Sequence, residues 1–473
     1  MTDRIDFVVI GTGPAGMAAA VLATELGLDT LLVDEQDAPG GQIYRGIERA
    51  EPGSTLGAEY FAGAPLAAAL RRSDAAYLPG TAVWHIDPDG TVSLISTGVS
   101  RTIRARRILI ATGAIERPVP IPGWTLPGVM TAGAAQIALK TAGLVPSGRA
   151  VLAGQGPLLW LLAAQLVRAG APPSLILETT PHANHHAATP LLPGALWPGR
   201  RALAKGLGLI HEVKRAGIPI VHRVTGLAAL GRAGGDQRVE RVAWNGGEAP
   251  ADLLLLHEGV IPNTQISLGL QLDHRWDPAQ LCWRPVVDEW GATALQTISI
   301  AGDGGGIAGA EAAALTGRLA ALDAASFLDK IGPAERDRRA RPLRRALKRE
   351  LALRPFLDAL YRPARSVLLP ADGVIACRCE EVTAGQVRRT ARLGAQGPNQ
   401  AKAFTRCGMG PCQGRICGPI VSQVMADALD KPVAEIGAYR PRAPYKPITL
   451  GTIAGLVHPE GSSKARTGAV GGA

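Results

Sequence analysis

Five of the six cysteines lie in one window of the sequence, and their spacing could hold a metal centre. Cys377 and Cys379 form a Cys-x-Cys pair, and Cys407 and Cys412 form a second close pair after an interval of 27 residues. Four thiolates are the number of ligands that a 2Fe–2S cluster needs. The glycines around the second pair allow the backbone to wrap closely and to direct N–H groups at sulfur. We therefore predict a 2Fe–2S cluster bound by Cys377, Cys379, Cys407 and Cys412.

Zinc is the main alternative for these thiols, but structural zinc sites favour two to four residues between paired cysteines, and Cys-x-Cys fits them poorly. Disulfides would be unusual in the cytoplasm. Cys417 follows Cys412 by about one helical turn. We expect Cys417 to be a packing residue, with the replacement of one ligand as the alternative.

A glycine-rich turn near the start of the sequence has the spacing of a dinucleotide site. It lies between the apolar strand that ends at Ile10 and a helix-like run over 17–26. Its glycines suit a tight turn, close approach of a pyrophosphate and close helix–strand packing, and the helix N-terminus offers N–H groups to phosphate. An acidic residue at the end of the next strand can accept hydrogen bonds from a ribose diol. The predicted cofactor-binding residues here are Gly11, Gly13, Pro14, Ala15, Gly16, Asp34 and Glu35.

Two later strands end in residues that could close the same site. One strand runs into Thr112 and Gly113, and the other ends at Gly302 and Asp303 before a helix. An aspartate in this position can hold a ribityl hydroxyl, and the dipole of the following helix can favour electron density on a flavin. These four residues are therefore predicted to bind a flavin nucleotide.

A second strand–turn–helix unit follows at 149–169, with Gly154 and Gly156 in its turn. The third glycine position holds Leu159, which hinders close helix–strand packing. The next strand ends in Glu178, which would repel a 2′-phosphate. We expect a Rossmann-like domain that has lost its ligand, with NAD binding as the alternative.

The composition excludes several classes of protein. Of 473 residues, 47% are hydrophobic and 19% are charged, which excludes a mainly disordered protein. The net charge is +10, but aromatic residues make up only 4%, which argues against nucleic-acid binding. The most apolar run, 158–167, is about half of the length needed to span a bilayer, and no signal-peptide pattern is present. We expect a cytoplasmic protein without a transmembrane segment, at most peripheral to the inner membrane face.

The stretch 310–365 is predicted to be helical, with breaks at Gly332–Pro333, Pro342 and Pro355. Arginines accumulate along it, and Leu343, Leu347 and Leu351 form an apolar stripe. We expect this stripe to pack a solvated helix, and the main alternative is a surface that binds another polypeptide of the same enzyme.

The nucleotide motifs resemble those of the two-dinucleotide-binding-domain flavoproteins. The resemblance implies an α/β fold with a split FAD domain and an inserted second Rossmann-like domain. Disulfide reductases of that superfamily carry a cysteine pair near the flavin, whereas the residues up to Leu281 contain no cysteine, which excludes their thiol chemistry. The expected parts are FAD-binding at 1–119, second Rossmann-like at 120–250, FAD-binding at 251–325, helical linker at 326–370, 2Fe–2S domain at 371–440 and tail at 441–473.

The cysteine segment 405–415 resembles the bacterioferritin-associated-ferredoxin-like 2Fe–2S domain. Together with the stretch 38–45, which contains Gly41 and Gln42, it is similar to the flavin subunits of heteromeric amine dehydrogenases. These include the flavin subunits of the opine oxidases, of the multimeric proline and hydroxyproline dehydrogenases, and of hydrogen cyanide synthase. The resemblance adds Gly41 and Gln42 to the cofactor-binding residues. It also implies a partner β subunit of the amino-acid-oxidase-like flavoprotein type, in some members an FMN at the interface, and a small third subunit.

The sequence thus predicts the electron-transfer flavin and iron–sulfur subunit of an FAD-dependent dehydrogenase that oxidises an amino acid, an opine or a related secondary amine. A quinone or an electron carrier would be the acceptor. The alternative is a self-contained NAD(P)H-dependent flavin and iron–sulfur reductase, against which Leu159 and Glu178 argue.

Overall fold

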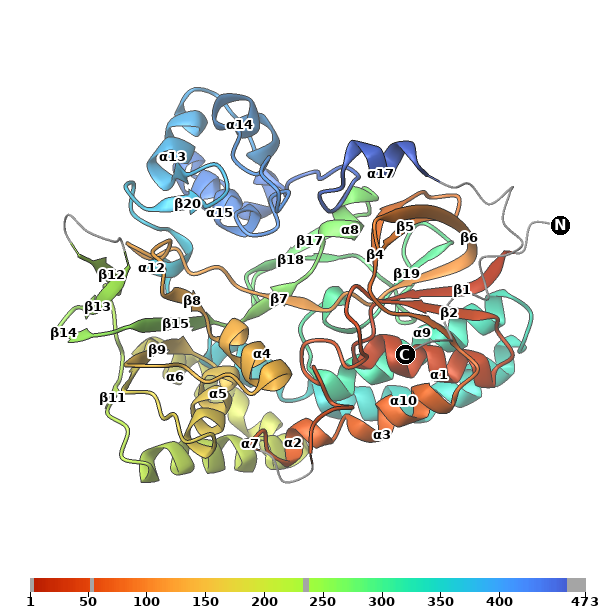
Figure 1. Cartoon of the computed structure of the whole chain (residues 1–473), viewed down its shortest axis with the longest axis horizontal. Coiled ribbons are helices and arrows are strands. Elements are labelled where there is room, and N and C mark those ends of the chain that lie inside the picture. Colours follow the sequence, from red (N-terminus) through yellow and green to blue (C-terminus); the bar gives the residue numbers. More distant parts are fainter. Residues whose placement is uncertain (1–3, 52–54, 233–237, 457–473) are drawn as a thin grey trace.

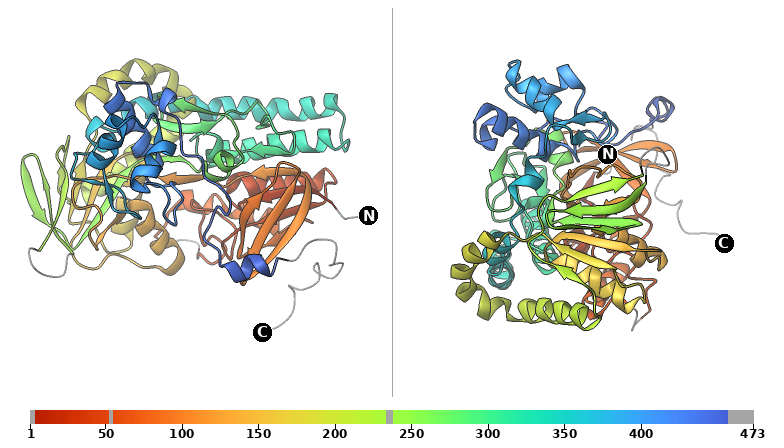
Figure 2. Two further views of the ribbon diagram at one scale, coloured as in Figure 1. Left: turned by 90° about the horizontal axis from the view of Figure 1, so that it is seen from above. Right: turned by 90° about the vertical axis from the view of Figure 1, so that its left-hand side faces the viewer.

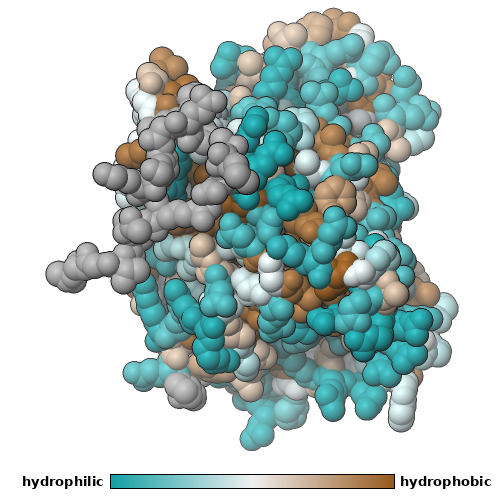
Figure 3. Space-filling view, turned by 90° about the vertical axis from the view of Figure 1, so that its right-hand side faces the viewer, coloured by the Kyte–Doolittle hydropathy of each residue, from teal (hydrophilic) through white to brown (hydrophobic). Residues whose placement is uncertain are grey.

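The computed structural model describes residues 4–51, 55–232 and 238–456. A first and a second α/β domain lie side by side, and a smaller helical domain that carries the cysteines sits against both (Figure 1). None of the helices in these ranges is long and apolar enough to cross a membrane. The face shown in Figure 3 is mainly hydrophilic, with small separate hydrophobic patches.

The first domain is built on a seven-stranded sheet in the order β3-β2-β1-β6-β5-β4, and β19 pairs with the C-terminal part of β6. Strands β3, β2, β1, β6 and β19 are parallel, so their carboxyl ends meet at one edge. β1 is an apolar run covered on both faces, as buried parallel strands are. The strand bounds are β1 Ile5–Ile10, β2 Thr30–Val33, β3 Ala76–Leu78, β4 Thr81–Ile86, β5 Thr91–Ser96, β6 Val99–Ile110 and β19 Ile298–Ile300.

Alanine-rich helices cover this sheet. α1 and α9 cross so closely that a Cβ on Gly317 would lie 2.0 Å from the carbonyl oxygen of Ala15. The small side chains of both helices make this approach possible. α10 (Pro333–Leu351) lies along α9 on the outside (Figure 2). The bounds are α1 Pro14–Glu25, α2 Ala58–Phe61, α3 Ala64–Arg72, α8 Gln265–Gly269, 3₁₀ helix η2 Gly302–Gly305 and α9 Ala310–Phe327, with hairpin strands β17 His274–Asp277 and β18 Cys282–Pro285.

The second domain has a five-stranded parallel sheet in the order β11-β10-β9-β15-β8, with a three-stranded antiparallel sheet beside it. This confirms the inserted Rossmann-like domain. β7 (Ala114–Glu116) and β16 (Val260–Pro262) pair where the chain passes between the two domains. The other bounds are β8 Val129–Thr131, α4 Ala132–Ala142, β9 Ala150–Gln155, α5 Pro157–Arg168, β10 Leu175–Glu178, α6 His182–Ala188, η1 Thr189–Leu191, α7 Leu192–Arg215, β11 Ile220–Val221, β12 Ala228–Gly231, β13 Val239–Trp244, β14 Gly247–Pro250 and β15 Leu253–Glu258.

The second sheet continues beyond residue 250, where the sequence suggested that the insert would end. β15 pairs with both β9 and β8 and forms the centre of this sheet. Its run of leucines is buried on both faces, which a sequence pattern alone does not assign to one sheet or the other.

The linker is helical, as predicted, but one expected break was wrong. α10 spans Pro333–Leu351 without interruption at Pro342, which lies inside the helix. Leu343 and Leu347 pack against the core of the first domain, which confirms the role of these two residues of the apolar stripe, whereas Leu351 is exposed. The free energy gained from this packing offsets the loss of the backbone hydrogen bond that a proline removes. α11 (Arg354–Leu360) and α12 (Arg365–Leu368) complete the linker.

The cysteine domain follows the linker. Thr383 caps α13 with its side chain and forms a capping box with Gln386, which fixes the start of this helix. After α16 the chain leaves this domain and returns to the first one, where α17 lies (Figure 1). The bounds are β20 Ile375–Cys377, β21 Val382–Thr383, α13 Ala384–Arg392, α14 Pro398–Thr405, α15 Gly418–Leu429, α16 Val433–Ile436 and α17 Leu450–Ala454.

Candidate nucleotide sites and metal centre

The first glycine turn connects β1 to α1 at the carboxyl edge of the first sheet. Gly11 has a φ of 104°, and a Cβ on Gly16 would lie 1.8 Å from the carbonyl oxygen of Gly11. Only glycine fits these two positions. Gly13 differs, because the nearest atom to its notional Cβ is the Cα of Gly41, 4.0 Å away. The surface over Gly13 is therefore open, and Pro14 and Ala15 begin the helix beneath it.

The carboxylate of Asp34 holds this turn to the end of β2. Its Oδ2 accepts hydrogen bonds from both the backbone N–H and the hydroxyl of Thr12, each at 2.6 Å, and its Oδ1 accepts one from the N–H of Gln36 at 2.8 Å. The structure thus gives Asp34 a bracing role in the turn. Its contact with a ribose stays a prediction. Glu35, the next residue, forms an ion pair with Lys446.

The loop that contains Gly41 and Gln42 lies directly on the glycine turn. Gly40 donates a backbone hydrogen bond of 2.9 Å to the carbonyl of Thr12. Lys140 of α4 fixes the loop from below, since its Nζ donates to the carbonyl oxygens of Gln42 at 3.2 Å and Ile43 at 2.9 Å. Burial lowers the pKa of Lys140 to about 8. The sequence did not single out Lys140, which lies in another domain.

Gly302 closes the site from the other side, because its notional Cβ would lie 2.9 Å from the Cβ of Ala15. Asp303 accepts hydrogen bonds at Oδ1 from the N–H groups of Ala308, at 2.8 Å, and Gly309, at 3.0 Å. Its second oxygen receives no hydrogen bond from the described residues.

The segment around Thr112 and Gly113 lies beside the same site. A Cβ on Gly304, next to Asp303, would lie 3.5 Å from the carbonyl oxygen of Gly113. Asn263 donates its N–H to that oxygen at 3.0 Å, and its own Oδ1 is buried without a partner in the described ranges. An orphaned buried acceptor costs about 1–3 kcal/mol, so it favours a ligand at this place. The residues predicted for a flavin nucleotide are therefore gathered at one edge, and they fit such a group.

The second glycine turn connects β9 to α5 in the second domain. A Cβ on Gly154 would lie 1.8 Å from the carbonyl oxygen of His257, and Leu159 is fully buried. Glu258 lies at the carboxyl end of β15 and accepts hydrogen bonds from Gln155 at 2.7 Å and Thr179 at 2.6 Å. Burial raises the pKa of Glu258. Three polar side chains are thus paired with one another at the carboxyl edge of the second sheet.

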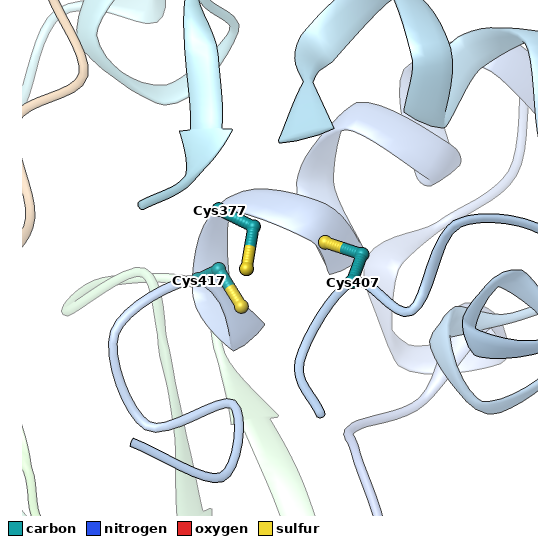
Figure 4. Close-up of side chains that lie close together, drawn as sticks. All are labelled: Cys377, Cys407 and Cys417. Atoms are coloured by element: carbon teal, nitrogen blue, oxygen red, sulfur yellow. The ribbon is translucent and has the colours of Figure 1, made fainter. Parts of the chain in front are cut away.

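Three cysteines converge in the core of the cysteine domain (Figure 4). The sulfur atoms of Cys377, Cys407 and Cys417 all lie within 4.8 Å of one another, and each residue is at most 1% exposed. The loop between Cys407 and Cys417 turns back through Gly408 and Gly414, which have φ values of 86° and 79°. Cys417 is thus both a core residue and a neighbour of two predicted ligands, which the linear spacing did not reveal.

Cys377 is the thiol of this group that loses its proton most easily. The thiols of Cys407 and Cys417 and the backbone N–H groups of Gly408 and Glu380 donate hydrogen bonds to its sulfur, and they lower its pKa to about 2. The hydrogen bond with Cys377 raises the pKa of Cys407 to about 12. Three buried sulfurs this close together suit a metal cation, because a thiolate is the form of cysteine that binds metals.

Cys379 and Cys412 form a second pair at the outer side. Cys379 is exposed and Cys412 is half-buried. The thiol and the backbone N–H of Cys412 are within hydrogen-bonding reach of the Cys379 sulfur. A Cβ on Gly410 would lie 2.3 Å from the Cβ of Cys379, so glycine allows this approach. All five thiols therefore lie in one small domain, and the choice of Cys377, Cys379, Cys407 and Cys412 as ligands stays a prediction.

The split first sheet, the inserted parallel sheet and the open glycine turn define a two-dinucleotide-binding flavoprotein fold. In agreement with this class, residues 5–317 match the family model of the pyridine nucleotide-disulphide oxidoreductases. Residues 377–456 match the model of the sarcosine oxidase A3 domain, which covers the cysteine domain and the chain that follows it.

The chain belongs to the family of the opine oxidase A subunits and is an FAD-dependent oxidoreductase of that family. It is 43% identical to the A subunit of opine oxidase from Agrobacterium tumefaciens (strain Ach5), over 99% of this chain and 95% of the relative. It is 35% identical to the hydrogen cyanide synthase subunit HcnB of Pseudomonas aeruginosa, over 95% of this chain and 98% of the relative. The predicted family is therefore confirmed.

A solved structure has the same overall fold. The crystal structure of L-proline dehydrogenase from P. horikoshii superposes with a TM-score of 0.66 over 95% of this chain and 79% of that chain, at 22% identity. This similarity confirms the α/β architecture with its C-terminal domain.

Proposed function

We propose that this chain is the electron-transfer subunit of a heteromeric dehydrogenase, and that it binds FAD at the first glycine turn and a 2Fe–2S cluster at the cysteines. The observation that carries the proposal is the buried group of three thiols around Cys377, in the same chain as an open glycine turn. The relatives support the same conclusion, since one is named as a subunit of opine oxidase and another as a subunit of hydrogen cyanide synthase.

The two groups together would supply a change from two-electron to one-electron transfer, because a flavin can accept an electron pair and an iron–sulfur cluster carries single electrons. The chain's own residues prepare both places. Gly13 leaves room for the pyrophosphate, and the orphaned Oδ1 of Asn263 offers an acceptor. Cys377 offers a thiolate, and the N–H groups of Gly408 and Glu380 stabilise negative charge on its sulfur.

We propose that the substrate is an amino acid, an opine or a related secondary amine, and that its C–N bond is oxidised on a partner flavoprotein of the amino-acid-oxidase type. The relatives whose names contain opine oxidase and hydrogen cyanide synthase support this class of substrate. An FMN at the interface and a small third subunit belong to the same proposal, as does a quinone or an electron carrier as acceptor.

Stopped-flow reduction of the chain, alone and with its partner, tests this function. We expect no reduction of the isolated chain by NADH or NADPH, because the buried Leu159 replaces the third glycine of the second turn and Glu178 repels a 2′-phosphate. We expect reduction by a candidate amine only when the partner is present. Saturable reduction of the isolated chain by NADH would instead establish the self-contained reductase.

A further inference from the structure

After the cysteine domain, the chain returns to the first domain and is anchored there. Tyr445 is 3% exposed and lies in the same hydrophobic cluster as residues of the first sheet. Its N–H donates to the carbonyl of Trp84 at 2.9 Å. A Cβ on Gly269 would lie 2.3 Å from the tyrosine ring, so the ring can pack here only because residue 269 is glycine. We name residues 440–456 the C-terminal strap.

Gln265 of α8 joins the strap to the cysteine domain. Its Nε2 donates to the carbonyl of Tyr445 at 2.6 Å, and its Oε1 accepts a hydrogen bond from Arg415 at 3.0 Å. Arg415 lies between Cys412 and Cys417 in the sequence. The position of the strap is therefore fixed from two domains at once.

The next residue of the strap reaches the first nucleotide site. Nζ of Lys446 forms an ion pair with Oε2 of Glu35, the residue after Asp34 at the end of β2. Asp34 in turn holds Thr12 in the glycine turn. Burial lowers the pKa of Lys446, and the charge of Asp34 opposes this effect. The ammonium group thus lies at the acidic end of β2, 411 positions along the chain from its carboxylate partner.

In a Rossmann-like domain, the acidic end of the second strand lies at the ribose of the adenosine, and the glycine turn lies at the pyrophosphate. Two carboxylates at this place would repel the phosphates, and a neighbouring ammonium group offsets that repulsion. We propose that the C-terminal strap closes the adenosine end of the first site and that Lys446 is a positioning residue for an adenine dinucleotide. The inference rests on the proposed binding of FAD at this site.

The test measures the release of FAD from the full-length chain. Lys446→Met keeps the aliphatic stem and removes the charge, and we expect about tenfold faster release, as for the loss of one charge-assisted interaction. Lys446→Arg should release FAD at nearly the wild-type rate. Arg442→Met is the matched control, because Arg442 is an exposed cation of the same strap, and it should leave the rate unchanged.

A double-mutant cycle separates the ion pair from general loosening of the strap. Glu35→Gln and Lys446→Met should not be additive, so the double variant should release FAD no faster than the worse single variant. Iron content should stay at the wild-type value in every variant. Wild-type release by Lys446→Met would overturn the strap proposal. A wild-type chain that neither contains nor takes up FAD would instead overturn the proposed cofactor.

Discussion

A substitution of Gly13 should affect the binding of a nucleotide without affecting the stability of the fold. A Cβ at this position would meet no protein atom within 4 Å except the Cα of Gly41, whereas a Cβ on Gly16 would overlap the backbone. We therefore expect Gly13→Val to fold and to lose its bound nucleotide, because the side chain fills the space of the pyrophosphate. The measurement is flavin absorbance per purified chain.

The matched control for this variant is Gly206→Val, at an open position on α7. It should keep both the fold and the flavin. A Gly13→Val protein with full yellow absorbance would contradict the assignment of the first site.

The cysteines make a second prediction at the scale of residues. A cluster with two irons needs four thiolates, and the loss of one leaves an iron open to water and oxidation. Serine variants of the proposed ligands should each lower iron and acid-labile sulfide sharply, as measured by chemical analysis and by electron paramagnetic resonance after dithionite reduction. These variants are Cys377→Ser, Cys379→Ser, Cys407→Ser and Cys412→Ser.

Two other cysteines serve as controls of different kinds. Cys282 is buried in the first domain, where burial raises its pKa to about 12, and Cys282→Ser should leave the iron content unchanged. Cys417→Ser is the sharper comparison, because this thiol lies beside Cys377 and Cys407. Loss of iron in Cys417→Ser together with its retention in Cys412→Ser would reassign the fourth ligand. Zinc in place of iron in anaerobically purified protein would contradict the electron-transfer proposal.

At the scale of elements, Lys140 joins α4 of the second domain to the loop on the first glycine turn. Burial lowers its folded pKa to about 8, below the unfolded value of about 10.4. Between these values the unfolded chain binds more protons than the folded chain, so the free energy of unfolding rises with pH. We expect the stability of the wild type relative to Lys140→Met to rise by about 1 kcal/mol between pH 8 and pH 9.

Denaturant unfolding at the two pH values measures this difference. Lys205→Met, which removes an exposed lysine of α7, should show no such change with pH. If the difference in free energy of unfolding between wild type and Lys140→Met is the same at both pH values, burial does not disfavour the charged form of Lys140 in the folded protein.

The elements that the sequence predicted best are those with local signals. The turn at Gly11 and Gly16 follows from the glycines themselves, because only glycine fits these positions. Pro342 is also a local signal, but the helix break that it predicted was wrong. Packing of Leu343 and Leu347 on the first domain keeps the helix intact. Local propensity gives way where tertiary contacts contribute more.

The features that the sequence did not predict all depend on contacts between distant segments. Lys140 lies about one hundred positions from the loop that it fixes, and Lys446 pairs with a residue near the other end of the chain. The position of Cys417 depends on how the loop after Cys407 turns back. No periodicity or spacing encodes such approaches, since they arise only when complete domains pack together.

At the scale of the whole molecule, the two halves of the reaction can be separated by mutation. If substrate oxidation takes place on the partner, it does not depend on the cysteine domain of this chain. In the assembled enzyme, Cys377→Ser should therefore leave reduction of the partner's flavin by the amine intact and abolish electron delivery to an external dye. Stopped-flow spectra measure the reduction of the partner's flavin, and steady-state dye reduction measures electron delivery. Equal loss of the two rates would contradict the proposal that they take place on different subunits.

The late strand β19 has a consequence for the order in which the protein matures. Ile298 of β19 pairs with Ile108 of β6, and α9, which follows β19 in the sequence, packs against α1. A ribosome that has completed both glycine turns has not yet supplied Gly302 or Asp303. If Gly302 and Asp303 bind the cofactor as predicted, the inserted second domain emerges from the exit tunnel, and can begin to fold, before the first domain can bind that cofactor.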